Sequence, residues 1–191
     1  MICSKEEYKY YLKTDLQMTG ISNSRLIDRF KDRRFKFYKS LRLTEYYSNC
    51  RKDRIGTLIA KILRVRHHFI CDRYQWTIPI NVFGPGLSIV HVGTIVVSPQ
   101  AKIGKNCRIH VCTNIGRAYA KGNAGAPTLG DNIYIGPGAK IFGPIKLGNN
   151  IAIGANSVVN SSFEEGNCTI AGSPARKISY NTSDKYINYR G

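Results

Sequence analysis

His91 is the residue of this sequence whose type and setting best suit acid–base chemistry, and it lies in the segment GPGLSIVHVGTIVV (84–97). An imidazole with an unperturbed pKa of about 6.5 takes a proton from a hydroxyl readily at neutral pH, so His91 is a candidate general base. A lone histidine in an apolar segment is otherwise interpreted as a buried, hydrogen-bonded core residue. We favour the general base because of the repeat pattern into which His91 falls.

The cysteines and the other histidines do not predict a metal site. Six cysteines are scattered without a CxxC pair or a Cys/His cluster, so neither zinc binding nor a disulfide framework is indicated, and we expect reduced structural thiols. His67 and His68 precede the repeats and leave too few histidines for a three-histidine zinc centre.

Aliphatic residues recur at every sixth position in the second half of the chain. They are Val97, Ile103, Ile109 and Ile115, then Leu129, Ile135, Ile141, Leu147, Ile153 and Val159. Neither an α-helix nor an alternating strand has a period of six. The period fits a coil with three short flat faces, in which three hexads complete one turn and stacked coils place the aliphatic side chains in an internal ladder. The sequence therefore predicts a parallel β-helix.

Small residues accompany this ladder. Glycine follows the aliphatic at 104, 116, 130, 136, 148 and 154, where we expect it to let the chain bend at a corner. The fourth residue after the aliphatic is small or apolar at Ala101, Cys107, Ile133, Ala139, Ile145 and Ile151. Counting back six from Val97 reaches His91, so the pattern predicts a histidine inside the ladder. That placement is costly unless His91 faces a cleft.

The repeat is interrupted once. The spacing between Ile115 and Leu129 is 14 residues instead of 12, so the segment RAYAKGNAGAPT (117–128) is predicted to loop out of a coil. Such excursions from a regular scaffold often carry function, although an idle insertion is the alternative.

The first part of the chain is predicted to be helical, with residues 1–75 as an N-terminal helical region, 76–178 as the β-helix domain and 179–191 as a tail. Apolar residues recur at three- and four-residue steps, at Tyr8, Tyr11, Leu12, Leu16, Leu26, Ile27, Phe30, Ile55, Leu58, Ile59 and Ile62. A new helix is expected after Gly20 and residues 22–24. The aromatic and basic segment 33–47 could bind RNA, but an amphipathic helix with its aromatics inward is favoured.

The net charge of +17 is spread over both halves, +10 in residues 1–75 and +7 in residues 76–191. Such a surface attracts anions, although a solvated surface explains most of these charges. No nucleic-acid-binding motif accompanies the charge, so nucleic acid is not an expected partner. There is no apolar run of about 18 residues and no signal-peptide core, so we expect a cytoplasmic protein.

The hexads, the histidine before GTIVV, the excursion loop and the closing AGSPARKI (171–178) together resemble the left-handed β-helix acyltransferases of the serine acetyltransferase branch. The resemblance implies an all-β left-handed parallel β-helix with an N-terminal α-helical region. It implies an O-acetyltransferase that uses acetyl-CoA, with His91 as base, an oxyanion-binding N–H near Gly116 and Arg117, no metal, and a homotrimer with its sites between subunits. The implied coenzyme A positions are Arg117, Ala118, Gly136, Pro137 and Ala155, with Arg176 and Lys177 for the phosphates.

The sequence departs from that family at positions where serine and the catalytic histidine have charged partners. These positions hold Val90, Gly125, Ala126 and Trp76, which leaves Asp72 or His110 as candidate helpers of His91. We therefore expect a sugar hydroxyl as acceptor, in a capsule or other surface polysaccharide, with possible peripheral association to a membrane-linked glycan. Serine O-acetylation for cysteine biosynthesis is the alternative, and a non-catalytic solenoid binding module is a third.

Overall fold

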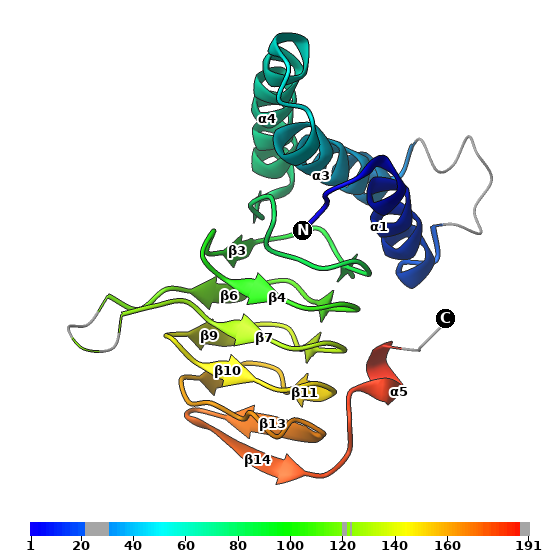
Figure 1. Ribbon diagram of the computed structural model, residues 1–191. Helices are drawn as coiled ribbons and strands as arrows, with labels where there is room; N and C mark the ends of the chain where they lie inside the picture. The colour runs from blue at the N-terminus through cyan, green and yellow to red at the C-terminus, as the bar shows by residue number, and fades with distance from the viewer. Residues whose placement is uncertain (22–30, 120–121, 123, 188–191) are drawn as a thin grey trace.

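The computed structural model describes residues 1–21, 31–119, 122 and 124–187. A helical region sits on one end of a three-sided solenoid whose coils stack along a single axis (Figure 1). This confirms the predicted β-helix with an N-terminal helical region. The predicted helix with Leu26, Ile27 and Phe30 lies outside the described residues.

The described part of the helical region contains three long helices, α1 (Lys5–Met18), α3 (Arg33–Cys50) and α4 (Arg54–Tyr74). The side chains of Ser4, Asp32 and Asp53 cap the starts of these helices, and each accepts a hydrogen bond from a backbone N–H of the first turn. Gln75, in the left-handed conformation with φ of 59°, ends α4. No helix in the described part of the chain is long and apolar enough to cross a membrane.

The packing faces of α3 and α4 differ in the residues that form them. Phe35, Phe37 and Tyr38 on α3 are buried, as expected for an amphipathic helix. On α4, the aliphatic residues whose spacing predicted a helix do not form its buried face, because Ile55 and Leu58 are 69% and 60% exposed. The buried face is instead Gly56, Ala60, Leu63, His67, Cys71 and Tyr74. The buried face of α4 thus combines small residues with Leu63, His67 and Tyr74.

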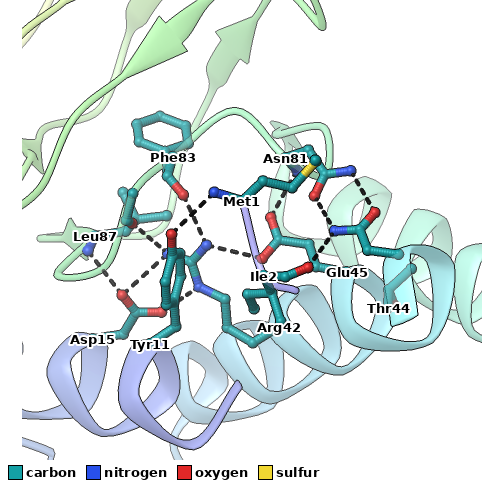
Figure 2. Close-up of polar contacts among 12 residues, drawn as sticks. Met1, Ile2, Tyr11, Asp15, Arg42, Thr44, Glu45, Asn81, Phe83 and Leu87 are labelled. Carbon is teal, nitrogen blue, oxygen red and sulfur yellow. Dashed lines mark hydrogen bonds and ion pairs between the residues drawn. The ribbon is translucent and has the colours of Figure 1, made fainter. Parts of the chain in front are cut away.

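A buried ionic cluster joins the helices to the first coil (Figure 2). The Arg42 guanidinium lies 2.7 Å from an oxygen of Asp15 and 3.0 Å from Glu45, and all three residues are buried. Its Nη1 and Nη2 also donate to the carbonyls of Phe83 and Gly84, at 2.9 Å and 2.7 Å. Nε, Nη1 and Nη2 of the guanidinium therefore each donate a hydrogen bond, as a buried charge requires. The cluster fixes how the solenoid begins beneath the helices.

Three parallel sheets form the sides of the solenoid. Sheet A contains β1 (Trp76–Thr77), β3 (Ile95–Val97), β6 (Thr113–Gly116), β9 (Lys140–Phe142) and β12 (Val158–Val159). Sheet B contains β4 (Lys102–Ile103), β7 (Thr128–Leu129) and β10 (Lys146–Leu147). Sheet C contains β2 (Ser88–Ile89), β5 (Arg108–Ile109), β8 (Tyr134–Ile135), β11 (Ile151–Ile153), β13 (Cys168–Gly172) and an antiparallel last strand β14 (Ala175–Ser179). A short helix, α5 (Asp184–Ile187), follows.

The aliphatic ladder is confirmed. All ten predicted ladder residues are buried, and they pair in register between coils, as Ile109 does with Ile135 and Ile115 with Ile141. The six small or apolar residues four positions later are buried as well. The core of the solenoid is therefore a stack of repeated side chains, and its stability comes from contacts between neighbouring coils.

The corner glycines serve a purpose other than the predicted one. A Cβ on Gly104 would lie 2.6 Å from the carbonyl oxygen of Gly130, so glycine is required because stacked backbones approach closely. Asparagines, rather than these glycines, take the left-handed conformation at the recurring turns of Asn106, Asn132, Asn150 and Asn167, with φ between 48° and 59°. Their side-chain amides are hydrogen-bonded to one another from coil to coil at 2.8 to 2.9 Å.

Candidate active site

His91 does not occupy the ladder, contrary to the prediction. Ile89 is fully buried and pairs with Ile109, so it takes the core position of the first coil on sheet C. Eight residues, rather than six, then separate Ile89 from Val97. The two additional residues enlarge the turn between β2 and β3, and His91 is exposed in that turn. Because Ile89 fills this core position, no imidazole has to be buried there, and His91 stays at the surface.

The turn of His91 lies at the corner between sheets C and A, where three of the predicted coenzyme A positions also lie. Gly136 and Pro137 follow Ile135, and Ala155 follows Ile153, at the same corner of later coils. The chain stays in register along this corner, because the N–H of Val90 donates to Ile109, that of His110 to Ile135 and that of Gly136 to Ile153, at 2.9 to 3.2 Å. The structure thus places His91, Gly136, Pro137 and Ala155 along one edge of the solenoid.

Small side chains leave the backbone of this edge accessible. Pro137 and Ala155 are exposed, and they project no long side chain over the corner. A Cβ on Gly136 would lie 2.8 Å from both the carbonyl oxygen of Ile153 and the amide nitrogen of Ala155. The short exposed side chains of Pro137 and Ala155 leave room for an extended chain along this edge, whereas buried Gly136 lets the coils stack closely.

Arg117 and Ala118 lie at a different corner, between sheets A and B. They follow β6, and Ala118 pairs with Gly125 through two backbone hydrogen bonds of 2.8 and 3.0 Å that close the predicted excursion loop. The Arg117 guanidinium lies 5.0 Å from the centre of the Tyr119 ring, and its buried Nε has no hydrogen-bond partner among the described residues. The loop leaves the solenoid on the side opposite α5 (Figure 1). Within one chain, sheet A separates these residues from His91, and loop positions 120, 121 and 123 lie outside the described residues.

Arg176 and Lys177 lie on β14, at the far end of sheet C, and both are exposed. Nη1 of Arg176 donates to the carbonyl of Ala175 at 3.0 Å, and Nζ of Lys177 lies 3.8 Å from the centre of the Tyr180 ring. The two cations are thus available to an anion at the last coil, several coils from His91.

Of the two candidate helpers of His91, His110 lies beside its ring and Asp72 pairs with another residue. Asp72 is on α4, where its carboxylate lies 3.3 Å from His68, and Trp76 is buried on β1. No described carboxylate forms a hydrogen bond or ion pair with His91. The neighbour of its ring is His110, at 6.4 Å between ring centroids. Burial, Arg108 and His91, in that order, lower the pKa of His110.

Two further residues near this site escaped the sequence analysis. Tyr134 packs edge-on against His110, and Tyr186 of α5 stacks on Tyr134. Tyr134 occupies an ordinary outward position of a hexad, and Tyr186 belongs to the tail beyond the repeats, so no periodic signal marks either.

No metal-binding group of three or more His, Cys, Asp or Glu side chains occurs in the described ranges, and all six cysteines are free.

Comparison with known proteins relates the solenoid to serine acetyltransferases, although no family model matches the chain. The serine acetyltransferase of Synechococcus elongatus is 36% identical over 95 residues, 50% of this chain and 38% of the relative. That of Helicobacter pylori strain 26695 is 40% identical over 96 residues, 50% of this chain and 55% of the relative. The chain thus matches about half, or less, of the length of these relatives.

Solved structures extend the similarity to the helices. The serine acetyltransferase of Brucella abortus strain S19 has a TM-score of 0.70 and 27% identity, over 93% of this chain and 71% of that one. Its complex with coenzyme A has a TM-score of 0.67 and 25% identity, over 93% and 70%. A Neisseria gonorrhoeae serine acetyltransferase in complex with serine has a TM-score of 0.65 and 25% identity, over 92% and 71%. The fold is therefore the hexapeptide-repeat left-handed β-helix.

Proposed function

We propose that this chain is an acetyl-CoA-dependent O-acetyltransferase that uses serine as acceptor and His91 as general base. The observation that carries the proposal is the shared corner of His91, Gly136, Pro137 and Ala155 on a solenoid homologous to serine acetyltransferases. The relatives support serine, which was the alternative acceptor, rather than the sugar of a surface polysaccharide. Nothing in the comparisons supports the sugar.

In the proposed reaction His91 takes the proton from the serine hydroxyl while that oxygen attacks the thioester carbonyl of acetyl-CoA. The tetrahedral intermediate then collapses, the carbon–sulfur bond breaks, and coenzyme A leaves as its thiolate while the acetyl group stays on oxygen. A neutral imidazole suits this step, because its unprotonated nitrogen can accept the proton of the hydroxyl. His91 is exposed in its turn, so an incoming hydroxyl can reach it.

We assign the coenzyme A site to the same corner. The pantetheine arm lies along the backbone of Gly136, Pro137 and Ala155, where no long side chain covers the main chain. Arg176 and Lys177 offer positive charge to the phosphates beyond the last coil.

The expected position of the excursion loop supports a homotrimer with sites between subunits. Arg117 and Ala118 lie one corner away from His91, across sheet A, so neither of them can complete the site of its own chain. Threefold packing through sheet A brings the loop of each subunit to the C–A corner of its neighbour. Backbone N–H groups near Gly116 and Arg117 would then stabilise the oxyanion in trans.

Release of free thiol from acetyl-CoA tests the activity, with serine and a panel of sugars, including acidic sugars, as acceptors. We expect release with serine and a loss of about 100-fold or more in His91→Ala. The exposed His68→Ala on α4 is the matched control and should retain full activity. Absence of release with every acceptor, or full activity of His91→Ala, would contradict the proposal, whereas release with sugars alone would restore the sugar acceptor. Sedimentation that finds an active monomer would contradict the trimer.

A further inference from the structure

Four aromatic rings form a continuous row along sheet C, from His91 to the C-terminal helix. The centroids of His91 and His110 are 6.4 Å apart, and Tyr134 meets the His110 ring edge-on at 5.3 Å. Tyr186 then stacks on Tyr134 at 4.4 Å with an angle of 23° between the rings. The row places a second imidazole directly beside the proposed general base.

The C-terminal helix α5 is held against this row by polar contacts. Nη1 of Arg108 donates to the carbonyl of Tyr186 at 3.1 Å, and the buried Ser183 donates through its hydroxyl to the carbonyl of Asn132 at 2.5 Å. Ile187, at the end of α5, is also buried. These contacts give Tyr186 a defined position, and its stack on Tyr134 restrains the ring against which His110 packs.

His110 is suited to accept a hydrogen bond. It is half-buried beside Arg108, whose positive charge adds to the effect of burial in keeping the imidazole neutral. A neutral imidazole has an unprotonated nitrogen with a free lone pair. On the preceding coil the equivalent position is Val90, which has no side-chain acceptor. His110 therefore supplies polar chemistry where the residue next to His91 has none.

We propose that His110 binds the ammonium group of the acceptor, accepting a hydrogen bond from it while His91 takes the proton of the hydroxyl, and that α5 positions His110 through Tyr134 and Tyr186. The proposal rests on the proposed function and defines the substrate class as 1,2-amino alcohols. In serine the ammonium and the hydroxyl are on adjacent carbons, so two adjacent imidazoles can each engage one of these groups. A protonated imidazole would repel the ammonium, whereas the neutral His110 offers it a lone pair. The positive charge of Arg108 beside His110 opposes ammonium binding, so this hydrogen bond has to outweigh that repulsion.

Equilibrium binding separates this role from catalysis. Serine and 3-hydroxypropionate, which lacks the amine, are titrated by NMR against the full chain, His110→Leu and His110→Gln. We expect the full chain to prefer serine, and His110→Leu to lose about 10- to 100-fold of that preference, the effect of one hydrogen bond to a charged group. The glutamine carbonyl also accepts a hydrogen bond, so His110→Gln should keep part of the preference.

The outcomes distinguish this inference from the proposed function. Equal weakening of both ligands in His110→Leu would mean a merely structural role, and no weakening, or no serine binding by the full chain, would also overturn the inference. Serine binding that depends on His110 without any release of thiol from acetyl-CoA would refute the proposed function and leave this inference standing.

Variants of α5 test the positioning role. Tyr186→Phe keeps the stacked ring and should retain the preference for serine, whereas Tyr186→Ala should reduce it severalfold without changing the affinity for 3-hydroxypropionate. An unchanged preference in Tyr186→Ala would show that α5 has no part in the site.

Discussion

Arg42 of α3 and Asp15 of α1 form an ion pair of 2.7 Å in which both side chains are fully buried. The same Asp15 accepts the backbone N–H groups of Gly86 and Leu87 at 2.8 and 2.9 Å. One carboxylate therefore links two helices and the first coil, which carries the turn of His91 a few residues later. The helical region thus fixes the start of the solenoid that holds the candidate site.

Removal of the Arg42 charge should destabilise the protein strongly. We expect Arg42→Met to lower the free energy of unfolding by about 3–5 kcal/mol, because Asp15 and Glu45 stay buried without their cation. Urea denaturation measures the change. Arg51→Met, which removes an exposed pair with Asp53, is the control and should leave the midpoint unchanged. Similar midpoints for the two variants would show that the cluster contributes little to stability.

Truncation of two adjacent residues of β4 should change the free energy of unfolding by very different amounts. Ile103 points into the ladder and Lys102 points to solvent. We expect Ile103→Ala to lower the free energy of unfolding by about 2–5 kcal/mol through the cavity it creates. Lys102→Ala should change it by less than about 0.5 kcal/mol. Thermal or chemical denaturation of both variants tests this, and a larger effect at Lys102 would contradict the assigned orientation.

Stability should decrease in mild acid because of His67. Burial lowers the pKa of this histidine, and one ring nitrogen lies 3.1 Å from the carbonyl of Ile78. The unfolded chain binds the proton first, near its unperturbed pKa of about 6.5. The stabilising contribution is therefore complete above that pH and is lost as the pH falls through the lower folded-state pKa. The depressed pKa of His110 acts in the same direction.

The measurement is the free energy of unfolding between pH 8 and pH 5. His67→Gln should show a shallower decrease than the unmodified chain, and the exposed His68→Gln should not. An equally steep decrease in His67→Gln would assign the acid sensitivity to other groups.

A bulky side chain at the C–A corner should impair coenzyme A binding selectively. Ala155→Trp would cover the backbone of this edge, so we expect the KM for acetyl-CoA to rise about tenfold or more, equivalent to about 1.4 kcal/mol. The KM for the acceptor should change less. Glu165→Trp, at an exposed turn between sheets B and C, is the control. Steady-state kinetics in which the concentration of each substrate is varied measure both KM values. Equal effects of the two variants would show that acetyl-CoA does not bind at this corner.

The periodic part of the fold was predictable to the residue, and the irregular parts were not. The ten ladder positions and the excursion loop follow directly from the six-residue spacing and its single break. The same counting misplaced His91, because the turn after Ile89 contains two additional residues. Nothing in the residue types of that turn marks the insertion. On α4 the spacing of the aliphatic residues predicted the helix but not its buried face, because Ile55 and Leu58 are exposed while Ala60 and Leu63 are buried.

By itself, the sequence determined the solenoid, the helical region and the choice of His91 as the residue to examine. A repeat specifies its core because each coil must present the same aliphatic side chain to the next. Only the tertiary structure decided that His91 is exposed at the C–A corner, that His110 is its neighbour, and that Tyr186 of α5 returns to the same face. These contacts join residues from different coils and from the tail, and their spacing along the chain carries no period that reveals them.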